Sequence, residues 1–279
     1  MTWIVGVGHL LVGMAYLSLG ILSAWEALTQ YQQRGLSRFG LGFSLMAASC
    51  GPHHLIHGWC ALNGDSVPPA MLAVTLIGLP AGLTFCLLRV EAMLGGAGDR
   101  VLTASPVTVA ALTAAVLGVF GVVAGQSMSS PPTPTSIICT ASGVQFLGGT
   151  TATAGQRADL ITFANLFVAV TYGMVGWYLV STQVRRYMLA RSWSLSGLSL
   201  AAVFPTCAAM HLILALTHGG DTATLAFDLL GVPASVYFLW VVRRLHSNAV
   251  IDWNRRPLVG VAATPKREAP WGDRPAVMR

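Results

Sequence analysis

Residues 34–56 have the sequence RGLSRFGLGFSLMAASCGPHHLI, and residues 191–213 have the related sequence RSWSLSGLSLAAVFPTCAAMHLI. Each stretch follows a basic loop, enters an apolar segment and carries Cys-x-x-x-His-Leu-Ile at the same depth. Self-similarity at a fixed offset indicates an internal repeat, so two copies of one module are predicted. At an offset of 157 residues the identities are Arg34/Arg191, Ser37/Ser194, Gly40/Gly197, Leu41/Leu198, Cys50/Cys207, His54/His211, Leu55/Leu212 and Ile56/Ile213.

The repeat extends into the neighbouring apolar segments on both sides. Two pairs of residues with the same seven-residue spacing precede the copies, and two related proline-containing segments follow them. Each copy is therefore predicted to be a unit of three helices. The flanking matches are His9/Asn165, Tyr16/Tyr172, and LIGLPAG at 76–82 with LLGVPAS at 229–235.

The composition places the chain among membrane proteins. Hydrophobic residues make up 54% of the sequence and charged residues only 9%, whereas about a quarter of a soluble domain is charged. The net charge of +6 does not indicate nucleic-acid binding, because the arginines lie at segment ends and in the C-terminal tail. No glycine-rich phosphate loop, HExxH or CxxC motif occurs, and no nucleophile and base recur at usable spacing, so an enzyme is not predicted.

Seven apolar segments are each close to the ~20 residues that a membrane-spanning helix needs. We predict an all-α membrane protein with two parallel three-helix repeats, formed by the first to third and the fifth to seventh helices and joined by the fourth. The segment 3–28 lacks a basic start and a cleavage site, so it is predicted to be a membrane helix. The spans are 3–28, 39–62, 70–88, 106–125, 159–184, 195–217 and 222–242, and the expected domains are 1–100, 101–157, 158–247 and a disordered basic tail at 248–279.

The distribution of arginine predicts the orientation. In a seven-helix arrangement only Arg157 falls on one side of the bilayer, and the other loop arginines fall on the opposite side. By the positive-inside rule the N-terminus is outside and the tail is cytoplasmic, as expected of a multi-pass plasma-membrane protein. The arginines on the inner side are Arg34, Arg38, Arg89, Arg100, Arg185, Arg186, Arg191, Arg243 and Arg244.

The first copy contains a candidate metal site. Cys50 and His54 are four residues apart, so they share one face of a helix. A thiolate and an imidazole together suit a soft metal such as Cu(I), and polar groups at membrane depth must face the bundle interior. Further candidate ligands are Met46 and His57 on the same stripe and His9 at a similar depth, with His53 about a quarter-turn away.

The second copy retains the pair as Cys207 and His211, but its other polar positions differ. Met210 replaces His53 and Asn165 replaces His9, while Asp228 lies inside the seventh segment and His218 near the outer end of the sixth. A cysteine, methionine and histidine set also suits Cu(I). The second copy is therefore either a second metal site or an altered copy held together by contact between Asp228 and a histidine.

The first unit resembles the ethylene-binding transmembrane domain of plant ethylene receptors and their cyanobacterial relatives. Residues 50–55, Cys-Gly-Pro-His-His-Leu, match the Cys-Gly-x-x-His-Leu setting of that family, and residues 14–18 resemble its Ala-Tyr-Phe-Ser segment. The resemblance covers the first three helices and, more weakly, the last three. It implies that Cys50 and His54 hold Cu(I) and that ethylene binds the metal by π-coordination. His9 stands where that family has an essential aspartate, and the resemblance includes no kinase or GAF output domain.

Several functions remain open at this stage. One is a Cu(I)-dependent receptor for a small gaseous ligand that acts through a partner protein or a homo-oligomer. A second is copper storage, delivery or transport, and a third is a b-haem or quinone subunit with His54 and His211 or His9 as axial ligands. A structural subunit of a membrane complex is a fourth. Cys60 and Cys139 both fall on the outer side, where a disulfide between them is also conceivable.

Overall fold

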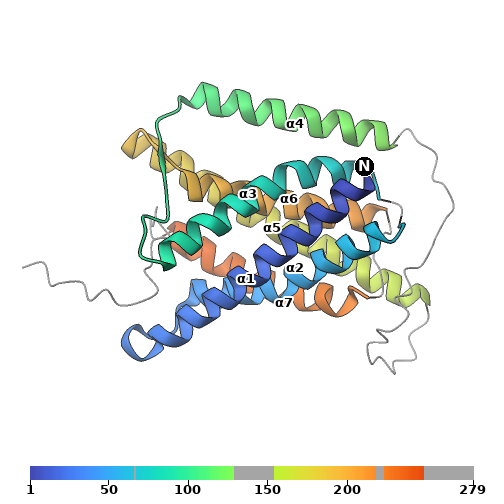
Figure 1. Cartoon of the computed structure of the whole chain (residues 1–279), viewed down its shortest axis with the longest axis horizontal. Helices are drawn as coiled ribbons and strands as arrows, with labels where there is room; N and C mark the ends of the chain where they lie inside the picture. Colours follow the sequence, from blue (N-terminus) through green and yellow to red (C-terminus); the bar gives the residue numbers. More distant parts are fainter. Residues whose placement is uncertain (66, 129–153, 218–222, 248–279) are drawn as a thin grey trace, which may run out of the picture.

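The computed structural model describes residues 1–65, 67–128, 154–217 and 223–247. Within these residues the chain forms one bundle of seven helices, with α4 outermost beside α3 (Figure 1). Five segments are long and apolar enough to cross a membrane: Thr2–Tyr31, Ala70–Met93, Asp159–Ala190, Leu195–Leu216 and Leu225–Ser247. The all-helical, membrane-type fold agrees with the composition. The helices are α1 Thr2–Arg34, α2 Arg38–Leu62, α3 Ala70–Met93, α4 Pro106–Met128, α5 Ala154–Ala190, α6 Leu195–Leu216 and α7 Leu225–Ser247.

Several helices are longer than the apolar segments that predicted them. The polar stretch 30–38 was expected to be a loop, but α1 continues through it to Arg34, and α5 extends beyond both predicted ends. Glutamine and arginine are good helix formers, so leaving the apolar region does not by itself end a helix. The end of α1 is set instead by Gly35, whose φ of 71° is readily adopted by glycine.

The helices pack in a reciprocal pattern. Helix α1 contacts α2 and α3, and α5 contacts α6 and α7, while α2 also packs against α7 and α3 against α6. A Cβ at Gly231 of α7 would lie 2.8 Å from the Ser49 hydroxyl of α2, and a Cβ at Gly78 of α3 would lie 3.1 Å from the Thr206 hydroxyl of α6. Ser49 and Thr206 directly precede the two cysteines of interest, so these close approaches carry both cysteines into the centre of the bundle.

Helices α1 and α2 approach each other through glycines spaced seven residues apart. A Cβ at Gly13 would lie 2.9 Å from the Gly51 carbonyl oxygen, and a Cβ at Gly58 would lie 2.8 Å from the Gly6 carbonyl oxygen. Small residues at such spacing let two backbones come close together. The resulting contact brings the His9 side chain of α1 to His54 of α2.

We expect Gly58→Ala to lower the free energy of unfolding by about 1–3 kcal/mol, because the new methyl meets backbone atoms of α1 that cannot rotate away. Thermal unfolding in detergent measures the change. Gly173→Ala in α5 is the matched control, since nothing lies within 4 Å of its Cβ position, and alanine favours the helix by up to about 1 kcal/mol. Equal stability of the two variants would contradict the close approach.

The N-termini of α2 and α6 are capped in the same way. The Ser37 hydroxyl accepts a hydrogen bond from the Gly40 amide at 3.2 Å, and the Ser194 hydroxyl accepts one from the Gly197 amide at 3.0 Å. Both serines have extended backbone angles, as an N-cap residue requires. Two of the sequence identities at offset 157 therefore have a local structural reason.

A buried carboxylate adds a second cap to α6. Asp99 accepts hydrogen bonds from the Ser194 hydroxyl at 2.7 Å, the Ser196 amide at 2.9 Å and the Arg100 amide at 2.8 Å. An antiparallel pair between β1 (Val101–Leu102) and β2 (Trp193–Ser194) lies beside it. The loop after α3 is thereby attached to the start of α6.

The stability provided by Asp99 should depend on pH. Burial alone would raise the pKa of the Asp99 carboxyl, but hydrogen bonds led by that from Ser194 outweigh it, so the pKa is lowered. A lowered folded pKa gives a stabilisation that is complete above about pH 4 and is lost as the pH falls through the folded pKa. We expect Asp99→Ala to remove about 1 kcal/mol at neutral pH and to weaken the acid dependence of thermal unfolding. The control is Asp159→Ala, at an exposed carboxylate, which should keep the wild-type acid dependence of thermal unfolding. An unchanged acid dependence in Asp99→Ala would contradict the stabilising role assigned to the Asp99 carboxylate.

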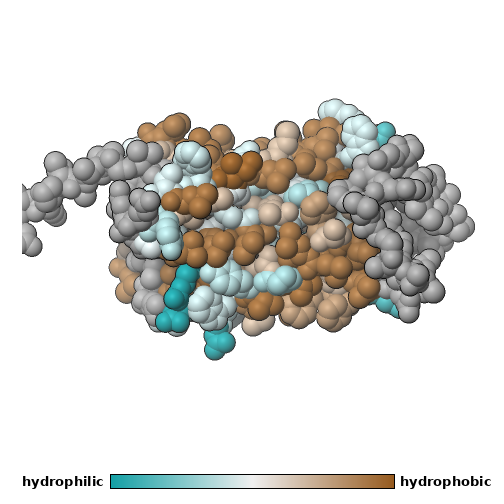
Figure 2. All heavy atoms as spheres, turned by 90° about the horizontal axis from the view of Figure 1, so that it is seen from below, coloured by the Kyte–Doolittle hydropathy of each residue, from teal (hydrophilic) through white to brown (hydrophobic). Residues whose placement is uncertain are grey.

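The outer surface is rich in large apolar side chains. Figure 2 shows hydrophobic residues over most of the described surface on one face. Leu76, Leu87 and Val170 are 55%, 69% and 64% exposed, respectively. Extended exposed apolar surface is unusual for a soluble monomer and is what lipid-facing helices present. The surface therefore supports a multi-pass membrane protein.

Candidate metal centre

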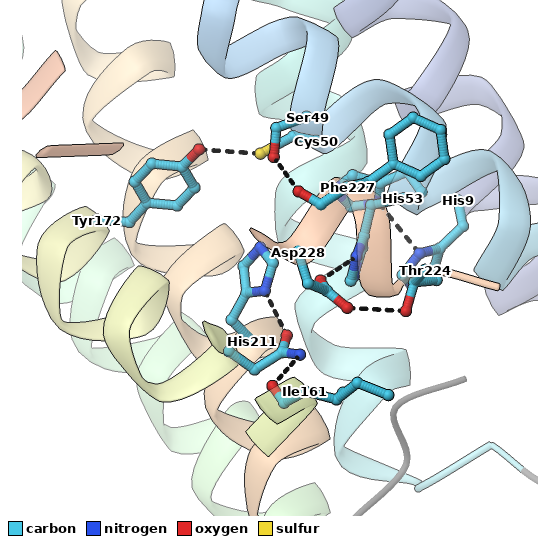
Figure 3. A network of polar contacts seen from close by, with 12 residues as sticks. His9, Ser49, Cys50, His53, Ile161, Tyr172, His211, Thr224, Phe227 and Asp228 are labelled. Carbon is cyan, nitrogen blue, oxygen red and sulfur yellow. Dashed lines mark hydrogen bonds and ion pairs between the residues drawn. The ribbon is translucent and has the colours of Figure 1, made fainter. Parts of the chain in front are cut away.

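The two cysteines of the predicted repeat, Cys50 and Cys207, lie buried at the centre of the bundle, one from each half of the chain. Cys50 on α2 is 1% exposed, and its sulfur lies 3.0 Å from the Tyr172 hydroxyl of α5 (Figure 3). Cys207 on α6 is also buried. Both belong to one hydrophobic cluster that includes Met46 and Met210. Both cysteines therefore lie in the buried, largely apolar core of the bundle.

Three donor atoms of this centre converge. The ligand atoms of Cys50, Cys207 and His211 all lie within 4.8 Å of one another, and all three residues are buried. One donor comes from the first half of the chain and two come from the second. The centre is therefore composite, and neither half contains all three donors.

The His211 ring is oriented by its neighbours. Its Nδ1 lies 2.6 Å from the Asn165 amide oxygen, and the Asn165 amide nitrogen donates to the Ile161 carbonyl at 2.9 Å. An amide oxygen accepts only, so Nδ1 carries the proton and Nε2 keeps its lone pair. Among the residues that the structure describes, the His211 Nε2 atom has no hydrogen-bond partner, and it is buried. A carbonyl oxygen that accepts from the other ring nitrogen, and so fixes the tautomer, is typical of metal-ligating histidines.

His54 lies beside the first helix and a small cavity. Its Nδ1 is 3.1 Å from the Nδ1 of His9, and its ring centroid is 5.4 Å from that of Tyr16. The cavity has a volume of about 20 Å³, enough for one molecule of the size of water. It is lined by His9, Tyr16, His54 and Cys207, among others. The cavity therefore reaches one of the three converging residues of the centre.

His53 belongs to a different group. Its Nδ1 lies 2.8 Å from the Asp228 Oδ1 of α7, an ion-pair distance that lacks the geometry of a directed hydrogen bond. The Thr224 hydroxyl donates to the other carboxylate oxygen at 2.8 Å (Figure 3). The His53 ring centroid is also 4.8 Å from that of His211 and 4.5 Å from that of His57. We call the group of Cys50, Cys207 and His211 the sulfur centre. The group around His53 therefore adjoins the sulfur centre through His211.

In the structure, the predicted site residues do not form two separate Cys/His pairs. Cys50 joins Cys207 and His211, whereas His54 contacts His9. Asn165 supports His211, and Asp228 contacts a histidine of the other half, namely His53. His218 and Cys139 lie outside the described residues, so the roles suggested for them stay predictions.

Some residues around the centre were not predicted as site residues. Tyr172 contacts Cys50, and its counterpart Tyr16 lines the cavity beside Cys207. Both share a seven-residue spacing, from His9 and from Asn165, and Tyr16 also lies in the segment 14–18 that carries the family resemblance. Thr224 precedes Asp228 by four residues, and a hydroxyl one helical turn from an intramembrane carboxylate could have been recognised as its partner.

The donor set fits a soft monovalent metal. Two sulfur ligands and one imidazole nitrogen suit soft and borderline ions, and Cu(I) is among those that thiolates select. The His211 Nε2 is buried and directed by Asn165, and it forms no hydrogen bond of ordinary geometry with the residues that the structure describes. Comparison with known proteins adds no relative, because no family model, curated protein or solved structure matches the chain.

Proposed function

We propose that this chain is an integral plasma-membrane protein that binds Cu(I) through Cys50, Cys207 and His211. The observation that carries the proposal is the convergence of these three buried donors within 4.8 Å. Copper supplies a soft cation to which a small neutral ligand can bind. The chain supplies two sulfurs, an oriented imidazole and an enclosed apolar setting.

The architecture that supports this function is a duplicated three-helix unit spanning the membrane seven times, with the N-terminus outside. Reciprocal packing of α2 on α7 and of α3 on α6 supports the duplication. The paired contacts of Gly231 with Ser49 and of Gly78 with Thr206 support it at residue level. An isologous arrangement of two related units is the commonest symmetry of protein dimers, and a fused chain can retain it.

The cavity next to the centre favours small-ligand sensing. Its volume of about 20 Å³ suits a small molecule. Cys207 belongs both to the cavity wall and to the converging donors. A ligand in the cavity would therefore adjoin the metal position. We propose that its binding is communicated to a partner protein, as the resemblance to ethylene receptors implies.

Metal analysis of the purified protein tests the proposal. We expect about one copper per chain by mass spectrometry after reconstitution under reducing conditions, since the three donors form a single centre. The copper-loaded protein should retain ethylene, and the copper-free protein should not. Copper without ethylene binding would favour copper handling, a Soret band would favour a haem subunit, and absence of copper would contradict the proposal.

A further inference from the structure

A second group of potential ligands lies next to the sulfur centre. The ligand atoms of His53, His211 and Asp228 lie within 4.8 Å of one another, and the three side chains come from α2, α6 and α7. All three residues are at least 97% buried. In Figure 3 the Asp228 carboxylate faces His53 and Thr224, with the His211 ring beside it.

Several atoms of this group have unused hydrogen-bonding capacity. The Nε2 atoms of His53 and His211 are buried and have no hydrogen-bond partners within the described part of the chain. Thr224 holds one oxygen of Asp228, and the other oxygen is directed to His53. Burying a polar atom without a hydrogen bond is unfavourable. A bound cation would satisfy such atoms together.

We propose that His53, His211 and Asp228 form a second cation site, for a borderline divalent ion of the Zn²⁺ class, which competes with the sulfur centre for His211. Two imidazoles and a carboxylate form a harder donor set than two sulfurs and one imidazole, and such sets bind Zn²⁺ in proteins. The divalent site itself does not depend on the proposed copper function, but the competition does.

The competition follows from the orientation of one ring. The Nδ1–H of His211 donates to Asn165 at 2.6 Å, and the Asn165 amide is fixed in turn by Ile161. Only the Nε2 lone pair of His211 is therefore available, and one lone pair binds one metal. A metal in the sulfur centre takes His211, which leaves the second site with only two protein ligands. A metal in the second site likewise takes His211, which leaves Cys50 and Cys207 without an imidazole ligand.

Titration of the full-length, metal-free protein in lipid nanodiscs with Zn²⁺ tests the site. Asp228→Asn keeps the shape and the acceptor for Thr224, and His53→Gln provides a second variant should the first fail to fold. We expect each to weaken Zn²⁺ binding by at least ~10-fold, a loss that is typical even when only a group orienting a ligand is replaced, and to alter Cu(I) affinity less than ~3-fold. Glu91→Gln removes half of an exposed ion pair on α3 and should leave Zn²⁺ affinity unchanged.

The outcomes separate the two proposals. Unchanged Zn²⁺ affinity in both Asp228→Asn and His53→Gln overturns the second site. Full simultaneous binding of one Cu(I) and one Zn²⁺ overturns the competition, whereas displacement of Zn²⁺ by Cu(I) in wild type but not in a Cys50→Ser/Cys207→Ser variant supports it. Zn²⁺ binding that depends on Asp228, in a protein that binds no copper, supports this site while contradicting the proposed function.

Discussion

Replacing either Cys50 or Cys207 by serine is expected to remove essentially all bound copper, from about one ion per chain to nearly none. Both sulfurs converge on the same point with His211, and a hydroxyl is a harder and much weaker ligand for Cu(I) than a thiolate. Two independent Cys/His sites would behave differently, because each single substitution would leave the other site loaded. Metal content of the purified variants by mass spectrometry distinguishes the two cases.

The control for this prediction is Cys86→Ser in α3. Cys86 is only partly buried, and its sulfur lies 4.0 Å from the Ala15 carbonyl, in neither group of converging donors. Copper content should stay at the wild-type level in this variant. A fall from two ions to one in Cys50→Ser, or retention of copper in Cys207→Ser, would contradict a shared centre.

Glu26→Ala is expected to lower the free energy of unfolding by about 3–5 kcal/mol, the range observed when one partner of a buried ion pair is removed. Glu26 of α1 accepts a hydrogen bond from Arg89 of α3, and the two side chains are only 7% and 10% exposed. The substitution removes the carboxylate that the buried Arg89 guanidinium contacts. Thermal unfolding in detergent, at matched protein concentration, measures the loss.

Glu91→Ala is the matched control on α3. Glu91 pairs with Arg100 at 3.0 Å, but their side chains are 33% and 53% exposed. An exposed pair contributes at most about 1 kcal/mol, so this variant should unfold close to wild type. Similar losses in Glu26→Ala and Glu91→Ala would show that burial of the first pair does not strengthen it.

The helices were largely predictable because apolar length is a direct signal. The start of α3 was predicted at residue 70 and that of α6 at residue 195, where they are found. The ends of α1 and α5 were not, because polar helix formers continue a helix beyond the apolar region. Hydropathy locates the lipid-facing part of a helix, while the helix itself ends at a backbone feature such as Gly35.

The candidate site was predictable in its residues but not in its grouping. Spacing within a helix placed Cys50 and His54 on one side of α2, and both side chains are buried. Sequence cannot tell how the two halves dock, and the docking decides that Cys50 meets Cys207 while His54 meets His9. The buried pair of Glu26 and Arg89 was missed for a related reason, since the residues are 63 positions apart and meet only through packing.

The reciprocal packing of the two halves has an evolutionary consequence. On the proposed duplication, an ancestral protein of three helices would have paired with an identical copy, and every substitution would have appeared twice across the axis. Fusion into one chain removes that constraint. His53 faces Asp228, whereas the positions that match them in the other half are Met210 and Thr75. A carboxylate on one side of a pseudosymmetric core is a specialisation that a homodimer cannot encode.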